Sequence, residues 1–500
     1  MNNYYILPLF TVIPLAGAFL ISLIGKRINK ISDILGIFTC LLLCYISFLS
    51  IHLYNLYGVL TYNVGGWKPP TGIGMVLDGF TSFMLVVINL VAFLVALYSK
   101  DYMEKFTSKD KFYTLFLLML AGMNGVIITG DLFNLFVFLE IAAVASYALV
   151  AFGTERHELE AAFKYAIMGT VGSLFILLGI VFLYSYTSTL NMADMAEVLA
   201  QKGTNSIVLM AGGLFIMGFG LKAALVPFHA WLPDAHPSAP APISAMLSGV
   251  LIKSLGVYAI CRIFFNVLGL TSIISAILMF LGVLSMVVGA ILAIGQWDFK
   301  RLLAYSSISQ IGYIVLGIGL ATPLGIIGGL FHLLNHSTFK SLLFLNSGAV
   351  EYSVGTRNLK DMGGLSHRMP VTTTTGLIAS MSIAGVPPFS GFWSKLIIII
   401  ACVEAGKFLY AFCAVLVSIL TLAMYMKVIR YAFFGSLKEK LRMIKETPLF
   451  MKFSMVVLAF ICLIGGILFI PSLKEVFLKP AGDILLEGTK YATMVLKGIK

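Results

Sequence analysis

Long apolar segments, separated by short polar loops, follow one another along almost the whole chain. A helix needs about 20 apolar residues to cross the roughly 30 Å hydrocarbon core of a bilayer. Fourteen segments meet this requirement, and the composition agrees, because 59% of the 500 residues are hydrophobic and only 11% are charged. The pattern predicts an all-α polytopic membrane protein. The expected spans are 4–24, 32–54, 78–99, 112–130, 132–152, 162–186, 207–226, 241–266, 272–296, 302–320, 322–348, 370–402, 406–428 and 453–470.

The basic residues are distributed unevenly between the predicted loops. Of the 34 Lys and Arg residues, 21 lie in odd-numbered loops. Cytoplasmic loops carry an excess of Lys and Arg, so we expect the N-terminus outside and, after fourteen spans, the C-terminus on the same side. The formal net charge of +12 then reflects topology, and no nucleic-acid partner is expected. Even-numbered loops hold only Lys68, Lys202, Arg262 and Lys407.

Five ionisable side chains interrupt the apolar segments, where charge is expensive. A charge at the centre of a spanning helix costs roughly 2.5 to 3.5 kcal/mol on insertion scales, so such residues indicate internal partners and an ion or proton path. At 1.5 Å per residue, Glu140 is expected about 13 Å and Lys253 about 18 Å into the membrane, whereas Lys340 has the reach to snorkel to the inner surface. The five residues are Glu140, Lys222, Lys253, Lys340 and Lys395.

Two proline-rich breaks accompany two of these lysines. Residues 221–242 read LKAALVPFHAWLPDAHPSAPAP and contain Lys222, and residues 384–395 read AGVPPFSGFWSK and end at Lys395. Proline removes a backbone donor and interrupts a helix, and the freed backbone groups need protein or water partners at that depth. A single break is most simply a proline kink. Two similar breaks, each beside a lysine, favour an internal repeat with polar sites at the interruptions.

His332, His336 and Lys340 follow one another at intervals of four residues, which places them on one helix face. Such histidines suit a proton wire, because they titrate near neutral pH. Hydrogen-bonded bridging between helices is a plain alternative, and metal binding lacks a third ligand. The six cysteines lie in apolar segments without a CxxC pair, so we expect no metal, cofactor or redox centre in this chain.

Four stretches together resemble a known family. DLFNLFVFLEIAAVASYALVAF, LKAALVPFHAWLPDAHPSAPAPISAMLSGVLIKSLGVYAI, FHLLNHSTFKSLLFL and VPPFSGFWSK are similar to the antiporter-like subunits of respiratory complex I, Mrp-type sodium/proton antiporters and membrane-bound hydrogenases. Within that group, the chain looks most like the D-type Mrp subunit and its hydrogenase counterpart.

The resemblance implies a fourteen-helix fold with two inverted five-helix repeats and broken helices 7 and 12. The implied parts are 1–111 (helices 1–3), 112–267 (helices 4–8), 272–433 (helices 9–13) and 450–500 (helix 14 and a short tail). It also implies site roles. A Glu140–Lys222 pair is followed by Lys253, then by His332 and His336, with Lys395 as the terminal group, and Lys340 also fits the family's pattern.

The implied function is translocation of H⁺, with Na⁺ as an open alternative, by a membrane subunit of a larger complex. We expect other membrane subunits as partners, and a redox module with iron–sulfur or nickel–iron centres if the complex is redox-driven. An Mrp-type antiporter or a hydrogenase-type complex in a prokaryotic cell membrane is favoured, with complex I as the alternative. A self-sufficient secondary transporter, a quinone site in this chain and a purely structural subunit are the competing interpretations.

Overall fold

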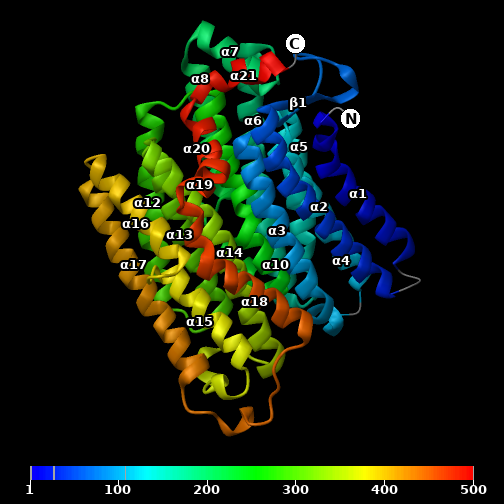
Figure 1. Cartoon of the computed structure of the whole chain (residues 1–500), viewed down its shortest axis with the longest axis vertical. Helices are drawn as coiled ribbons and strands as arrows, with labels where there is room; N and C mark the ends of the chain where they lie inside the picture. The colour runs from blue at the N-terminus through cyan, green and yellow to red at the C-terminus, as the bar shows by residue number, and fades with distance from the viewer. Residues whose placement is uncertain (1–2, 26–28, 107, 499–500) are drawn as a thin grey trace.

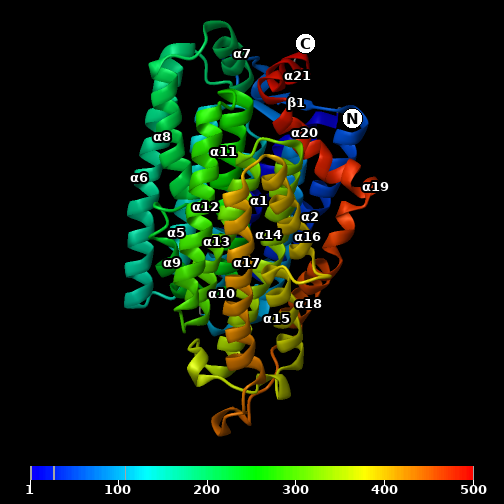
Figure 2. The same ribbon diagram turned by 90° about the vertical axis from the view of Figure 1, so that its left-hand side faces the viewer.

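The computed structural model describes residues 3–25, 29–106 and 108–498. Its long helices run side by side along the long axis of the molecule and form one bundle, with the short helices α7 (Met192–Lys202) and α21 (Tyr491–Gly498) lying across one end (Figure 1, Figure 2). Eleven of the described helices are long and apolar enough to cross a membrane, as expected for a multi-pass membrane protein. The predicted number of fourteen spans, the inverted repeats and the four-part division of the chain stay predictions.

Both predicted breaks occur between separate helices. α8 ends at Lys222 and α9 begins at Leu232, while α15 ends at Ala384 and α16 begins at Ser390.

The α-helices are α1 (Ile6–Ile24), α2 (Asn29–Tyr57), α3 (Gly79–Tyr102), α4 (Lys109–Ile128), α5 (Leu132–Val150), α6 (Arg156–Thr187), α7 (Met192–Lys202), α8 (Ser206–Lys222), α9 (Leu232–Ser238), α10 (Ala241–Met246), α11 (Ala259–Cys261), α12 (Ser272–Ile294), α13 (Phe299–Gly319), α14 (Pro323–Val354), α15 (Pro370–Ala384), α16 (Ser390–Glu404), α17 (Phe408–Val428), α18 (Leu449–Ile464), α19 (Pro471–Leu473), α20 (Lys479–Leu486) and α21 (Tyr491–Gly498).

A small β-hairpin adds to the helices and was not part of the all-α prediction. β1 (Leu60–Asn63) pairs antiparallel with β2 (Gly74–Leu77) in the connection between α2 and α3. The backbone N–H of Gly130 donates to the Gly74 carbonyl at 2.8 Å, which ties the hairpin to the turn before α5. Strand pairing satisfies backbone groups that have no helix to satisfy them.

The basic loops gather at one end of the bundle. Lys109 Nζ lies 3.0 Å from Asp33 Oδ2, and Lys105 Nζ donates to the Tyr352 carbonyl at 2.8 Å, so loops distant in sequence meet there. The two chain ends lie together at the opposite end (Figure 1). We call the end with the basic loops the basic end, and the end with the two chain termini the terminal end.

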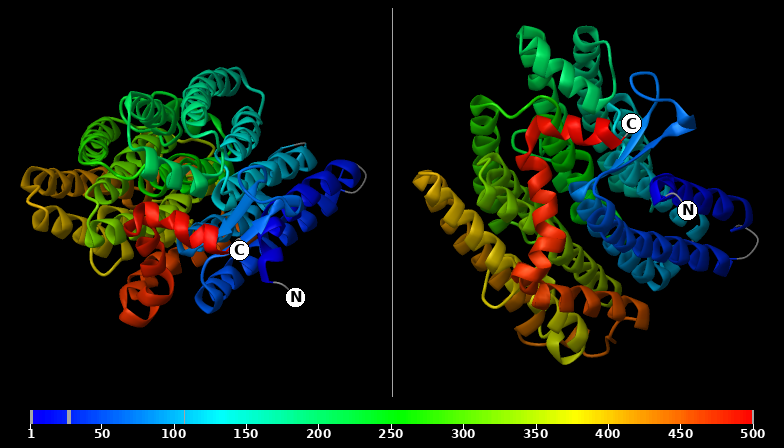
Figure 3. Two further views of the ribbon diagram at one scale, coloured as in Figure 1. Left: turned by 90° about the horizontal axis from the view of Figure 1, so that it is seen from above. Right: turned by 45° about the horizontal axis from the view of Figure 1, so that its top comes forward.

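The segment after α18, predicted as a tail, folds back along the bundle. α20 packs against α3 and α14, and α21 packs against α7 (Figure 3). Asn266 Nδ2 donates to the carbonyls of Ile484 at 2.8 Å and Gly488 at 3.1 Å, which anchors this segment.

The expectation that Arg262 lies in a loop is wrong. The helix that begins with α10 continues to Val267, and the Arg262 side chain is only 2% exposed. Its Nη1 lies 2.8 Å from Oδ2 of Asp78, which is fully buried. A buried charge is tolerated only with a close partner, and a carboxylate 184 residues earlier in the chain supplies it here.

α14 runs through the interior of the bundle. Every residue from 325 to 350 is buried, including His332, His336 and Lys340. A helix surrounded by protein on all sides can carry polar residues, because neighbouring helices supply hydrogen-bond partners. α14 therefore places three candidate residues away from lipid.

Candidate functional site

Glu140 and Lys222 face each other from different helices. Glu140 lies near the middle of α5, and Lys222 is the last residue of α8. Their Oε1 and Nζ atoms are 3.7 Å apart, and Ser173 on α6 donates its hydroxyl to the same carboxylate oxygen. Within the described residues Lys222 Nζ has no hydrogen-bond partner, so the carboxylate is the group that offsets its charge.

The backbone leaves the helix directly after Lys222. Ala224 has φ of +55°, in the left-handed region that residues with a Cβ rarely adopt. The break packs against Gly256, where an added Cβ would lie 2.5 Å from backbone atoms of Ala223. The helix that carries Lys253 therefore packs directly against the backbone at the end of α8.

Lys253 is fully buried and bonds to its own helix. Nζ donates to the carbonyls of Ser248 at 2.7 Å and Gly249 at 2.5 Å. The segments Leu247–Leu251 and Lys253–Tyr258 are π-helical. Such turns are rare, recur at functional sites and depart from the i to i−4 bonding of an α-helix, which leaves carbonyls for a side chain to use.

Lys340 is also fully buried, so the expected snorkelling to the inner surface is wrong. Its Nζ donates to Ser306 Oγ at 2.9 Å and to the Tyr425 hydroxyl at 3.4 Å. Those two hydroxyls are themselves 2.9 Å apart. The partners come from α13 and α17, which cover Lys340 in the interior and keep it from the surface.

His332 and His336 lie one turn apart on α14 with nearly parallel rings, 6.4 Å between centroids. His332 Nδ1 lies 2.9 Å from Ser394 Oγ, and its Nε2 lies 3.1 Å from Gln310 Oε1. Both ring nitrogens of His332 are thus used in hydrogen bonds, which leaves none for a metal. His336 is fully buried, and its ring nitrogens have no partner in the part of the chain that the structure describes.

The Lys395 side chain bridges the second break, between α15 and α16. Its Nζ donates to the carbonyl of Ile383 at 2.8 Å, and Gly385, with φ of +81°, ends α15. The last carbonyls of a helix lack intrahelical partners, so the ammonium satisfies groups that the break exposes. The Tyr313 ring lies 4.9 Å from Lys395 Nζ and 5.5 Å from the His332 ring.

These contacts place the candidate residues in one band, which we call the central band and which is buried except at the partly exposed Glu140. Gly249, an acceptor for Lys253, lies so close to Ser341 that an added Cβ would be 2.0 Å from Ser341 Oγ. Ser341 follows Lys340, which is one turn from His336. Backbone packing alone links Lys222 with Lys253, since no described hydrogen bond joins them. The members are Glu140, Lys222, Lys253, Lys340, His336, His332 and Lys395.

Several hydroxyl and amide groups of the site were not anticipated. Ser306, Ser307 and Gln310 of α13 all take part, with Ser307 Oγ 2.7 Å from Ser248 Oγ. Their signal was present in AYSSISQIGY, a run of polar residues inside an apolar segment. Ser394 and Tyr425 carried no such signal, because an isolated hydroxyl is common in membrane helices.

Sequence comparison assigns the chain to a family. The family described as NADH:quinone oxidoreductase/Mrp antiporter, TM, matches residues 129–421. The chain belongs to this family. All seven residues of the central band lie inside the matched region. A second description, NADH-Ubiquinone oxidoreductase (complex I), chain 5 N-terminus, matches residues 68–116.

Relatives within the NADH:quinone oxidoreductase/Mrp antiporter family come from three kinds of complex. The N-type subunit of NADH-quinone oxidoreductase from Desulforudis audaxviator is 39% identical, with 76% of each chain covered. The D-type subunit of the Na⁺/H⁺ antiporter from Alkalihalophilus pseudofirmus is 36% identical, with 88% of each chain covered. A chain of an archaeal respiratory complex, the membrane-bound sulfane sulfur reductase, is 33% identical with a TM-score of 0.89, covering 98% of this chain and 99% of that one.

Proposed function

We propose that this chain is the proton-translocating subunit of a multi-subunit membrane complex, and that H⁺ moves along the central band. The observation that carries the proposal is that buried ionisable and hydroxyl groups follow one another between the two helix breaks. Lys222 lies at the first break and Lys395 at the second. Intramembrane ionisable residues of this kind mark ion and proton pathways.

The charges of the band are arranged so that each influences the next. Lys253, Lys340 and Lys395 donate to neutral oxygen atoms, and no described carboxylate contacts them. Unit charges interact more strongly across a protein interior than across water. A proton that arrives at one of these lysines therefore favours release from its neighbour.

The Glu140–Lys222 pair is the proposed control point. A carboxylate beside the ammonium stabilises the charged form, so moving Glu140 away would release the proton from Lys222. The Glu140 side chain is 30% exposed, and its neighbours Val137 and Val144 on α5 are 38% and 59% exposed. Because a carboxylate facing lipid is costly, we infer that another membrane subunit covers this face.

We assign the complex to an Mrp-type cation/proton antiporter or a membrane-bound hydrogenase type, with the NADH:quinone oxidoreductase type as the alternative. A relative in an Na⁺/H⁺ antiporter, one in an NADH-quinone oxidoreductase and one in a membrane-bound sulfane sulfur reductase support that range. In a redox-driven complex, partners would hold the iron–sulfur or nickel–iron centres, and this chain would carry no cofactor or metal. We place the chain in a prokaryotic cell membrane with its basic end inside and its N-terminus outside, following the charge rule.

Transport by the reconstituted complex tests the relay. The assembled complex in liposomes is expected to move H⁺, and Lys253→Ala is expected to slow transport by roughly 10²-fold or more, as for loss of a general acid–base group. Lys202→Ala is the control, because that lysine is exposed on α7. Full transport by Lys253→Ala in an assembled complex would falsify the relay. Replacing Na⁺ by choline in the same assay decides whether Na⁺ is exchanged.

Composition of the purified complex decides its type. The tagged chain is purified in mild detergent, and its partners are identified together with bound metal. Iron–sulfur or nickel–iron subunits in stoichiometric amounts would identify a redox-driven pump. Small membrane subunits without iron would identify an Mrp-type antiporter, and transport by the chain alone would overturn the assignment to a complex.

A further inference from the structure

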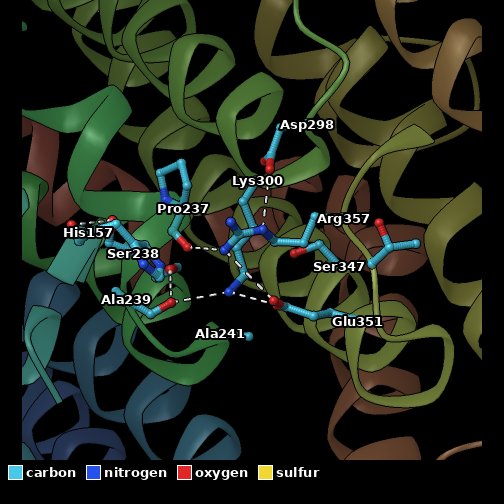
Figure 4. Close-up of polar contacts among 12 residues, drawn as sticks. His157, Pro237, Ser238, Ala239, Ala241, Asp298, Lys300, Ser347, Glu351 and Arg357 are labelled. Atoms are coloured by element: carbon cyan, nitrogen blue, oxygen red, sulfur yellow. Dashed lines mark hydrogen bonds and ion pairs between the residues drawn. The ribbon is translucent and has the colours of Figure 1, made fainter. Parts of the chain in front are cut away.

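A second charged cluster lies at the basic end, outside the central band (Figure 4). Lys300 Nζ lies 2.9 Å from Glu351 Oε2 and donates to the Ala239 carbonyl at 3.1 Å. The Lys300 side chain is only 2% exposed, whereas Glu351 keeps 29%. Arg357 bonds to the Pro237 carbonyl and approaches Glu351 at 3.7 Å and Asp298 at 3.2 Å. Four charged side chains thus lie together, and two of them, Lys300 and Arg357, bond to the backbone at the C-terminal end of α9.

A cavity of about 480 Å³ reaches this cluster. Its lining includes Lys300, Glu351 and Arg357 together with residues 237–240. The Glu351 carboxylate is therefore paired with Lys300 and is also open to the cavity. A cavity of this size has room for several water molecules beside the carboxylate.

His236 directly precedes residues 237–240, which line the cavity. Its side chain is fully buried, and neither ring nitrogen has a hydrogen-bond partner among the described residues. Buried polar atoms are rarely left without partners, so such a group calls for an explanation. The backbone around it is held in place, because Ser244 Oγ donates to the His236 carbonyl at 2.8 Å.

Phe344 connects His236 with the central band. The His236 ring stacks on Phe344 with 4.6 Å between centroids, and Lys340 Nζ lies 5.8 Å from the centre of the same ring. Further along α14, an added Cβ at Gly348 would lie 2.2 Å from Ala241 Cβ. The face of α14 that carries Lys340, Phe344 and Glu351 is therefore packed against the segment that contains His236.

We propose that this cavity is the opening of the proton path at the basic end, with Glu351 taking up the proton and His236 passing it to Lys340. The inference rests on the proposed function. A proton from water binds the Glu351 carboxylate, which removes its attraction for Lys300. Water carries that proton to one ring nitrogen of His236, and the other nitrogen gives its own proton through water to neutral Lys340, because no described hydrogen bond joins His236 to either side chain. Charge and atoms balance, and reorientation of the imidazole turns the protonated nitrogen toward Lys340 and the free nitrogen toward Glu351 for the next proton.

Chemical rescue tests the role of His236. In the reconstituted complex, His236→Ala is expected to slow H⁺ transport at least about tenfold. The loss of an acid–base group accounts for an effect of this size. Added imidazole should restore part of the rate, because the vacated site adjoins Pro237, which lines the cavity. His367→Ala is the control, since that histidine is exposed at the same end outside the cavity. Loss without rescue in an assembled complex would show a structural role and overturn the proposal, as would an unchanged rate.

Glu351 provides the second variant. Glu351→Gln is expected to slow transport at least about tenfold, and Glu351→Asp to recover most of the rate, because only the acids bind and release a proton at this position. A wild-type rate in Glu351→Gln overturns the proposal even if His236→Ala fails to assemble. Lys253→Ala separates the two hypotheses: if it abolishes transport while His236 and Glu351 variants are active, the relay stands and this opening does not.

Discussion

Oε1 of Glu140 lies 3.7 Å from Nζ of Lys222, at the point where α8 ends and the backbone breaks. The distance is that of an ion pair rather than a short hydrogen bond, so the contact can be lengthened without breaking a directional bond. The pair joins a partly exposed face of α5 to the buried start of the central band.

Glu140→Gln and Lys222→Ala are expected to abolish coupled proton transport while leaving the complex assembled. Glutamine keeps the size and the acceptor for Ser173 but removes the charge that holds the proton on Lys222. Proton flux in liposomes and co-purification of partner subunits measure the two properties separately. Full proton transport by both variants would contradict the proposed control point.

Gly256→Val is expected to destabilise the protein by about 1 to 3 kcal/mol, because the new Cβ would lie 2.5 Å from backbone atoms of Ala223. Backbone at the end of α8 cannot move away as a side-chain tip can. Gly213→Val is the matched control, since no atom lies within 4 Å of a Cβ added there. Glycine is also unfavourable inside a helix, so its replacement in α8 is not expected to destabilise the protein. Thermal unfolding in detergent compares the variants, and equal midpoints for Gly256→Val and wild type would contradict the close packing.

Asp78→Asn is expected to destabilise the protein by about 3 to 5 kcal/mol, because it leaves the Arg262 charge buried without its partner. Replacing both charges, in Asp78→Asn with Arg262→Met, should restore much of the loss. Glu475→Gln is the control, since Glu475 and Lys479 are 57% and 45% exposed and such surface pairs contribute about 1 kcal/mol or less. A double variant less stable than either single variant would contradict this. It would show that Asp78 and Arg262 stabilise the fold by more than cancelling each other's buried charge.

Asp131 gives a pH-dependent prediction outside the membrane-spanning segments. Its carboxylate accepts the Asn134 N–H at 2.7 Å and caps α5, while burial raises the pKa of the group above its ordinary value. The folded state therefore binds this proton more tightly than the unfolded state, so the stability contributed by Asp131 falls as pH rises from the unfolded pKa through the folded pKa.

Asp131→Asn keeps a capping side chain and removes the titration. Its thermal stability relative to wild type is expected to be more favourable at pH 7 than at pH 4. Asp131→Ala loses the cap and is expected to cost about 1 kcal/mol. Unfolding midpoints in detergent at both pH values provide the measurement, and a wild-type advantage that grows with pH would reverse the sign argued here.

The membrane class, the two breaks and the seven ionisable residues of the central band were predictable from the sequence. Each depends on local properties: the length of an apolar run, the missing N–H of proline, or the cost of a charge in hydrocarbon. The Glu140–Lys222 pairing came from family resemblance, and the structure places those side chains in contact. The helix α7 and the hairpin β1–β2, by contrast, lie in connections where no strong periodic pattern indicated them.

The sequence by itself determined that this chain crosses a membrane and carries charge inside it, because hydropathy and charge act within one segment. Tertiary structure alone decided which partners stabilise those charges. Arg262, expected in a loop, is buried because Asp78 reaches it from the start of α3, and Lys340 stays inside because Ser306 and Tyr425 bind it from two other helices. Such contacts join residues far apart in the chain, and they exist only once the helices have packed.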